Sequence, residues 1–478
     1  MDFKTDERNA ILAKSLILIE KTTSALTQLD HWRFPTDSSE FARKLLVQAH
    51  ERLRNPTNLV PVDPAVLYNR LFSLQELAEL IERSSTDHIS WPLVSYCDEI
   101  WRQFFDHEKI KIFYSVTSEH NYSILRFSKL LSLYLRDVLP SAEISALTGG
   151  IEVYCLQLAS SEDANLPLYA NIGHEFGHAV FDARSTPLVE RLNARFTAIL
   201  PLIFADFQQM DANKAVPRFQ RTAHVIVSMA QELFCDLVGT MLMGPAFFLS
   251  LFEIAWGESK AVCKIRLAPD EQSIRAYPSF QFRLHCIRRW AEIDGFCKAA
   301  KEDFAKLKSS LQTLADCLAT VPTSHSDDSV KLRPSSDDDA DAIVNVVEKH
   351  LPQMKQAMEE YLEDCQGLMM QWYSIASPVV STADVGELLH RLENSILPNI
   401  VPTESLLGRP ATFASILNAC ALYRLHLLTT GSAEKAKELS RDTGIVERLT
   451  AKAFEVSFIQ REFAKWQGGL KHGSSEPS

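Results

Sequence analysis

The sequence predicts a mainly helical chain with a small β-sheet, an α+β fold. Apolar residues recur at helical spacing in residues 7–105 and again beyond residue 343. Two segments break this pattern, because "KIKIFYSV" (109–116) and "GGIEVYCLQLAS" (149–160) alternate and are rich in Ile, Val, Phe and Tyr. We therefore expect a small sheet with helical blocks before and after it.

Composition and charge narrow the class of protein. The chain has 478 residues, 46% of them hydrophobic and 23% charged, which is typical of a soluble protein with more than one domain. The net charge of −12, with no basic block larger than "IRRW" (287–290), argues against nucleic-acid binding. The N-terminus does not resemble a secretory signal, so we expect a cytoplasmic protein. The nine cysteines are scattered without a Cys-x-x-Cys pair and are expected to be reduced, mostly buried thiols.

One uncharged stretch, "LVGTMLMGPAFFLSLF" (237–252), has to be weighed as a membrane span. It is shorter than the roughly 20 residues needed to cross a bilayer, Pro245 interrupts it, and Asp236 and Glu253 flank it. We therefore expect a buried pair of helices and no membrane span.

Changes of pattern along the chain predict five regions. A polar run, "TVPTSHSDDSVKLRPSSDDDADA" (320–342), has too little apolar surface to order itself and is interpreted as a linker or loop. The regions are an N-terminal helical region (1–105), a central domain (106–318), the acidic linker or loop (319–342), a C-terminal helical region (343–467) and a disordered tail (468–478). The linker is a candidate cover for a cleft in the central domain, and the helical regions are candidate contacts for a protein partner.

The chemistry of the central domain depends on "NIGHEFGHAVF" (171–181). On a helix, His174 and His178 lie about 40° apart around the axis and about 6 Å apart along it, so their imidazoles are side by side and can reach one zinc ion. Glu175 flanks the position of a zinc-bound water and can take its proton. Gly177 lets another backbone or a substrate come close. The alternative is a helix with two partly buried histidines and no metal.

Two histidines need a third ligand to hold a catalytic zinc ion. Asp182 lies eight residues beyond His174, about 12 Å along a helix, too far for both to bind one ion. The segment "MAQELFCDLVGTMLMG" carries Glu232 and Asp236 on one face of an otherwise apolar helix, where unpaired carboxylates are costly. We expect Glu232 to be the third ligand and Asp236 to accept the free N–H of a ligand histidine. The alternative is that both carboxylates face solvent.

These motifs resemble those of the gluzincin zinc peptidases, in which His-Glu-x-x-His on one helix is followed by Glu-x-x-x-Asp on a later one. The segment "AYPSFQFRLHCI" (276–287) is similar to the His-Pro-x-x-x-x-Arg element of the branch that contains the CAAX prenyl endopeptidases and the heat-shock membrane protease. The resemblance covers residues 150–290 and implies a zincin-like catalytic domain with a small sheet and active-site helices. The membrane helices of that branch have no counterpart here.

The resemblance also implies the composition of the site. It assigns one Zn²⁺ per chain to the ligands His174, His178 and Glu232, with Glu175 as general base, Asp236 behind a ligand histidine and Arg283 as a stabiliser of the site. Tyr277 stands where that branch has the histidine of His-Pro, and a tyrosine hydroxyl can donate a hydrogen bond to a tetrahedral oxyanion. Without the resemblance, Tyr277 and Arg283 are ordinary loop and helix-start residues.

Three other features near the motifs carry weaker signals. The segment "IEVYCLQLAS" (151–160) is either an edge strand that pairs with an extended substrate or an interior strand of the sheet, since both patterns are alike. His224 and His285 are expected to be core or surface histidines outside the site. Cys235 is expected to be a small buried hydrophobic residue.

The function that these residues predict is a zinc-dependent endopeptidase acting on a protein or peptide substrate. Zinc polarises the scissile carbonyl, and Glu175 activates the bound water and then protonates the leaving amine. Hydrolysis of a non-peptide amide or ester would use the same residues. The alternative is a zinc-binding regulatory or interaction protein with a structural or vestigial site, which would have no need of Glu175.

Overall fold

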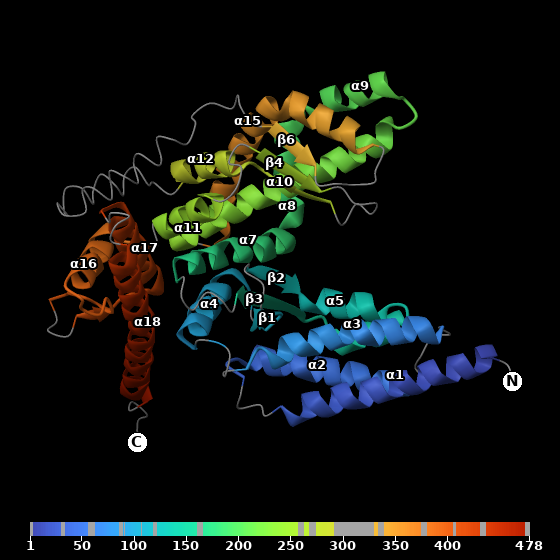
Figure 1. Cartoon of the computed structure of the whole chain (residues 1–478), viewed down its shortest axis with the longest axis horizontal. Coiled ribbons are helices and arrows are strands. Elements are labelled where there is room, and N and C mark those ends of the chain that lie inside the picture. The colour runs from blue at the N-terminus through green and yellow to red at the C-terminus, as the bar shows by residue number, and fades with distance from the viewer. Residues whose placement is uncertain are drawn as a thin grey trace. The chain divides into compact units, whose positions relative to one another are not determined.

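The computed structural model describes most of the chain, in two compact units, Met1–Asp163 and Ala164–Ser478 (Figure 1). The described residues are 3–29, 34–55, 63–85, 89, 91–106, 108–117, 122–159, 166–256, 262–266, 274–290, 329–332, 339–373, 380–404, 408–430 and 436–473. The expectation of a mainly helical chain with small sheets is confirmed. The expected boundary at residue 105 is not where the units divide, because the first sheet belongs with the N-terminal helices.

The first unit combines six helices and one three-stranded sheet among its described residues. The helices are α1 (Phe3–Gln28), α2 (Asp37–Arg54), α3 (Pro64–Glu82), α4 (Trp91–Phe104), α5 (Phe127–Leu135) and α6 (Ser141–Thr148), and the strands are β1 (Ile110–Thr117), β2 (Ser123–Arg126) and β3 (Glu152–Ala159). Helix α3 begins as its sequence dictates: the Asp63 carboxylate accepts a hydrogen bond from the Ala65 amide, and Pro64 occupies the first turn.

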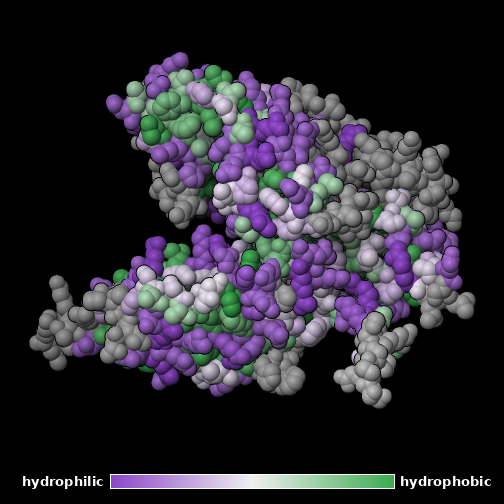
Figure 2. All heavy atoms as spheres, turned by 180° about the vertical axis from the view of Figure 1, so that it is seen from behind, coloured by the Kyte–Doolittle hydropathy of each residue, from purple (hydrophilic) through white to green (hydrophobic). Residues whose placement is uncertain are grey.

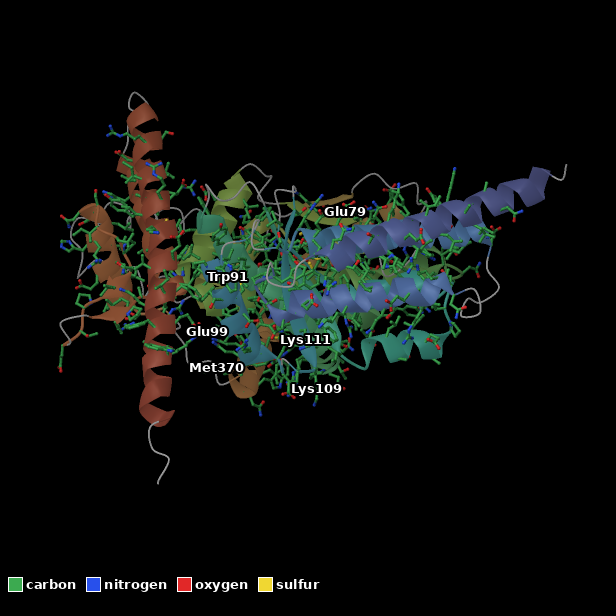
Figure 3. All side chains as sticks on the ribbon, turned by 90° about the horizontal axis from the view of Figure 1, so that it is seen from below. Glu79, Trp91, Glu99, Lys109, Lys111 and Met370 are labelled. Atoms are coloured by element: carbon green, nitrogen blue, oxygen red, sulfur yellow. The ribbon has the colours of Figure 1, made fainter. Side chains whose placement is uncertain are left out.

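The core of the first unit lies between its helices and the sheet. Leu67, Leu71 and Leu74 recur at helical spacing on α3 and are buried together with Phe113 of β1. The Lys111 ammonium group, labelled in Figure 3, lies 5.4 Å from the centroid of a ring on α2, that of Phe41. Apolar burial therefore holds this unit together, and the cation–π contact joins β1 to α2.

Strand β3, a candidate substrate-binding edge, is an interior strand. The order in the sheet is β1-β3-β2, with β1 parallel and β2 antiparallel to β3, so Leu156 pairs with both Tyr114 and Ile124. The edge interpretation is wrong because residues 123–126 form β2 and pair with β3. Over residues 154–157 both sides of β3 are therefore already paired within the sheet.

The second unit is also mainly helical and contains both motifs. Its helices are η4 (Leu166–Asn171), α7 (Ile172–Ala183), α8 (Ser185–Phe196), α9 (Leu200–Met210), α10 (Ala215–Met243), α11 (Pro245–Trp256), α12 (Phe280–Trp290), α15 (Ala340–Tyr373), α16 (Thr382–Glu393), α17 (Phe413–Thr430) and α18 (Ala436–Gly473). Its strands are β4 (Val262–Arg266), β5 (Arg275–Tyr277), β6 (Ser329–Leu332), β7 (Ile400–Val401) and β8 (Arg409–Pro410).

The uncharged stretch 237–252 is a pair of helices, as expected. Helix α10 ends at Met243, Gly244 takes a left-handed φ of 60°, and α11 begins at Pro245. The buried side chain of Asn418 on α17 joins the two ends, accepting from the Ala246 amide at 2.8 Å and donating to the Met243 carbonyl at 2.7 Å. Helix α10 is long and apolar enough to cross a membrane, but 78% of its most apolar window is buried inside the protein.

The segment expected to be a linker, 319–342, is in part a strand. Residues 329–332 form β6, which pairs in parallel with β4. The alternation of Val330 and Leu332 with polar neighbours suits a strand, and pairing with β4 supplies the order that the segment lacks alone. The remainder, apart from residues 339–342, lies outside the described residues. Helix α15, which follows, packs against α8, α9 and α10, so the C-terminal helices share a unit with the motifs.

The chain end and the surface complete the second unit. Residues 468–473, expected to belong to a disordered tail, instead continue helix α18 to Gly473, as helix propagation allows once a long helix exists. Residues 474–478 lie outside the described residues. In Figure 2 hydrophobic atoms gather at the upper left, over α9 and the start of α10, where Leu202, Met210 and Val216 are exposed.

Helices α7 and α10 are in backbone contact, and this contact positions the motifs. A Cβ atom added to Gly177 would lie 2.5 Å from Cys235 Cα, and one added to Gly173 would lie 2.9 Å from Gly239 Cα. No side chain fits at either glycine without moving α10. The expectation that Gly177 admits another backbone is confirmed.

Alanine at position 177 tests this contact. Gly→Ala inside a helix normally stabilises by about 1 kcal/mol. We expect Gly177→Ala instead to lower the free energy of unfolding by about 1–3 kcal/mol, because α7 and α10 must separate. The matched control is Gly367→Ala on α15, where an added Cβ meets nothing within 4 Å and the usual gain should appear. The measurement is the free energy of unfolding of both variants in urea. A similar increase in both would contradict the steric explanation.

Candidate metal centre

Helices α7 and α10 carry the candidate ligands. All four polar residues are buried. The exposed fraction is 9% for His174 and Glu175 on α7, 7% for Glu232 on α10 and 1% for Asp236. His174 and His178 lie one turn apart, with ring centroids separated by 5.0 Å and planes inclined at 84°. The helical spacing therefore places both imidazoles on the side of α7 that faces α10.

The Glu232 carboxylate of α10 approaches both imidazoles of α7, each through a different oxygen. His174 Nε2 lies 3.3 Å from Glu232 Oε2, and His178 Nε2 lies 3.8 Å from Glu232 Oε1. Ligands of a tetrahedral zinc ion with bonds near 2.0–2.1 Å are separated by about 3.3 Å, so these spacings are close to those that a metal requires. Two imidazoles and a carboxylate also form a donor set suited to a divalent transition metal.

Cys235 offers a second donor beside the same imidazoles. Its Sγ and one nitrogen each of His174 and His178 lie within 4.8 Å of one another, so this group also could hold a metal ion. The thiol sits in the contact between α7 and α10, because a Cβ added to Gly177 would be 3.1 Å from it. Burial, and then the nearby carboxylate of Glu232, raise the pKa of the thiol well above its ordinary value. Burial raises the pKa of Glu232, but its contacts with His174 outweigh this and lower it. The carboxylate is therefore ionised without a metal, whereas the thiol would lose its proton on binding one.

A chain of hydrogen bonds supports His174 from behind. His174 Nδ1 lies 2.9 Å from Asp236 Oδ1, and Arg283 on α12 donates to both oxygens of Asp236, each at 2.7 Å. An Asp236 that accepts from Nδ1 leaves Nε2, the nitrogen nearest Glu232, to bind a metal. Ser279 precedes helix α12 and caps it, because its Oγ accepts from the Phe282 amide at 3.1 Å, and Arg283 lies in the first turn.

Burial and charge separate the two histidines. Burial lowers the pKa of His174, but hydrogen bonds with Asp236 and Glu232 outweigh it and raise that pKa to about 10. Burial and the positive His174 lower the pKa of His178 to about 4. Without a metal, His174 is therefore protonated, and its two ring N–H groups face the carboxylates of Asp236 and Glu232. His178 is neutral. A metal ion bound at Nε2 of His174 would take the place of the proton on that nitrogen.

Glu175 follows His174 directly on α7, and Tyr277 ends strand β5, which contacts α10. Burial, followed by the charge of Glu232, raises the pKa of Tyr277, which is 41% exposed and thus a neutral hydroxyl at pH 7. The charge of Glu175 contributes to the same shift and to that of Cys235. Strand β5 is fixed to α10, because the Ala276 amide donates to Ser228 Oγ at 2.9 Å.

An aromatic side chain closes the site on the side of α11. The ring of Phe247 stacks on that of His174, with centroids 6.3 Å apart and planes inclined at 17°. The same ring packs on Gly239, where an added Cβ would lie 2.9 Å from it. This fully buried apolar contact keeps water away from one side of the imidazole and limits its rotation.

The structure leaves other residues outside this group. Asp182 is exposed at the end of α7, His224 is exposed and contacts the Gln220 carbonyl, and His285 lies 3.4 Å from Glu359. The closeness of Cys235 to the imidazoles was not expected, although its position three residues after Glu232 puts it near the same helix face. Arg275 was also given no role, although its alternation with Ala276 and Tyr277 indicates a strand with one exposed face.

No protein-family model, curated protein or solved structure matched this chain. The geometry of the donor groups therefore carries the functional argument.

Asp236→Asn tests the chain of hydrogen bonds. The amide cannot neutralise Arg283 or hold the His174 tautomer, so we expect zinc affinity to fall about 10–100-fold, measured by competition with a chromophoric chelator. The matched control is Asp206→Asn on α9, where a carboxylate contacts His350 and Lys349 of α15 at 2.8 and 2.7 Å. This control should leave zinc affinity unchanged. Equal zinc affinity in Asp236→Asn and the unaltered protein would contradict the assignment.

Proposed function

We propose that this chain is a zinc-dependent endopeptidase of the gluzincin type, with one zinc ion per chain. The observation that supports it best is the approach of Glu232 to His174 and His178 at 3.3 and 3.8 Å. The charges support it too, because the buried carboxylates of Glu232 and Asp236 both act on one buried guanidinium, that of Arg283, and Glu175 is buried as well. Such a group attracts a divalent cation.

Glu175 is the proposed general base. Zinc held by the two histidines and Glu232 would polarise the scissile carbonyl and make a nearby water more acidic. Glu175 follows His174 directly and is buried beside the donor groups, so its carboxylate can take a proton from that water. It then passes the proton to the nitrogen of the leaving amine as the C–N bond breaks.

Other residues position these groups and assist the developing charge. Asp236 orients His174, and Arg283 orients Asp236, so we assign Arg283 a positioning role through Asp236. The Tyr277 hydroxyl is the proposed donor to the oxyanion of the tetrahedral intermediate; like an ordinary tyrosine it is protonated at pH 7, and burial raises its pKa further. Asp236 and Arg283 therefore have positioning roles in the proposal, and Tyr277 has a role in stabilising the intermediate.

The proposed substrate is a protein that meets the enzyme in the cytoplasm. All cysteines among the described residues are buried free thiols, which suits a reducing compartment. Helix α18 exposes Ile459, Phe463 and Trp466 at helical spacing, an apolar face that we assign to contact with the protein substrate. Zincin-like folding of the second unit is part of the same proposal.

Glu175→Gln tests the peptidase mechanism. Loss of the base should lower the rate of cleavage of an unfolded casein substrate by about 10²–10⁴-fold, while zinc content stays at about one per chain. The matched control is Asp182→Asn, two turns along the same helix and exposed, which should cleave normally. Undiminished cleavage by the Glu175→Gln variant would reject the mechanism. Zinc without any cleavage in the unaltered protein would favour a regulatory protein with a vestigial site.

A further inference from the structure

Two strands of the second unit present a cluster of basic side chains on one face. Strands β4 and β5 are antiparallel, with Lys264 opposite Tyr277 and Arg266 opposite Arg275. Directly opposed residues, and residues two apart on one strand, lie on the same face of a sheet. Lys264, Arg266, Arg275 and Tyr277 therefore share one face, which we call the basic face.

The basic face is the exposed side of these strands. Arg266, Arg275 and Tyr277 are exposed and Lys264 is half-buried. The intervening residues Cys263, Ile265 and Ala276 are fully buried, so the opposite face belongs to the core. Neither strand carries a carboxylate. Three cations gathered in this way stand out in a chain whose net charge is −12.

The basic face adjoins the candidate metal centre. Ala276, between Arg275 and Tyr277, is hydrogen-bonded to Ser228, and Ser228 lies one helical turn before Glu232 on α10. One turn is about 5.4 Å along the axis, so the strand passes beside the candidate ligand. The positive charge of Arg275 also contributes to the low pKa of His178. A peptide held near the donor groups would lie within reach of these cations.

The outer edge of β5 is closed at the position where a substrate strand would pair. Strand β5 is at the edge of the sheet, but the Ala276 amide donates to Ser228 Oγ and the Ala276 carbonyl accepts from the same hydroxyl at 3.4 Å. A peptide cannot use these groups for main-chain pairing. Recognition on this side must come from the side chains of the basic face.

We propose that the basic face binds glutamate or aspartate side chains of the peptide substrate beside the scissile bond. Charge complementarity commits the face to an acidic peptide, and the exposed guanidinium groups of Arg266 and Arg275 suit paired hydrogen bonds with carboxylates. The inference rests on the proposed function for the cleavage itself. The preference for acidic peptides is a binding property and is tested apart from cleavage.

The test is binding of two labelled peptides to zinc-loaded Glu175→Gln protein, followed by fluorescence anisotropy. One peptide carries alternating glutamates and the other carries glutamines in their place. We expect the glutamate peptide to bind more tightly, with a preference that shrinks as salt is added. Arg266→Gln and Arg275→Gln should each weaken its binding about five- to tenfold, and Arg275→Lys should weaken it less. Zinc content should not change.

The matched control is Arg441→Gln, an exposed arginine of α18 with 70% of its side chain accessible, which should leave binding unchanged. Equal binding of the two peptides, or equal losses in Arg441→Gln and Arg275→Gln, would overturn the inference. Stronger binding of a labelled single-stranded oligonucleotide at the same residues would also overturn it. Tight, arginine-dependent binding of a glutamate peptide that the unaltered protein does not cleave would support the inference while removing the peptidase proposal.

Discussion

The backbone contact between α7 and α10 is the constraint on which the candidate metal centre depends. Side chains usually hold packed helices about 8–10 Å apart. At Gly173 and Gly177 there is no room for a Cβ atom, so α7 lies directly on the backbone of α10 at Gly239 and Cys235. The donor groups on both helices then meet at distances that suit a metal ion. Phe247 packs on Gly239 and on His174, so the same small residues also fix the position of the imidazole's apolar neighbour.

This arrangement buries charged side chains, which destabilises the folded state. Contacts with neighbouring residues offset that destabilisation. Asp236 is 1% exposed and Arg283 is 7% exposed, and a buried carboxylate without a partner would be strongly destabilising. Two hydrogen bonds to Arg283 and one contact with His174 satisfy Asp236. The C-terminal helices take part, because Asn418 joins α10 to α11 and α15 packs against α10. The second unit is thus built around the helix that carries Glu232.

The sequence alone could predict what depends on local helix geometry. The spacing of His174 and His178, and of Glu232 and Asp236, places each pair on one helix face because the helical repeat is fixed. The other features depend on contacts between segments that are far apart in the sequence. Strand β3 became interior because β2 pairs with it, and the closeness of Cys235 to the imidazoles follows from how α10 crosses α7. Alternation on β5 could have indicated the exposed face of Arg275, but not its place beside the metal centre.

We propose that His174, His178 and Glu232 bind zinc and that Cys235 does not. X-ray absorption at the zinc edge of the zinc-loaded protein tests it most directly, because sulfur and lighter ligands differ in distance and scattering. We expect nitrogen and oxygen ligands at about 2.0–2.1 Å and no sulfur. A sulfur ligand at about 2.3 Å, which Cys235→Ser removes, would show that the thiol takes the place assigned to Glu232. Failure of the protein to retain zinc at all would contradict the claim altogether.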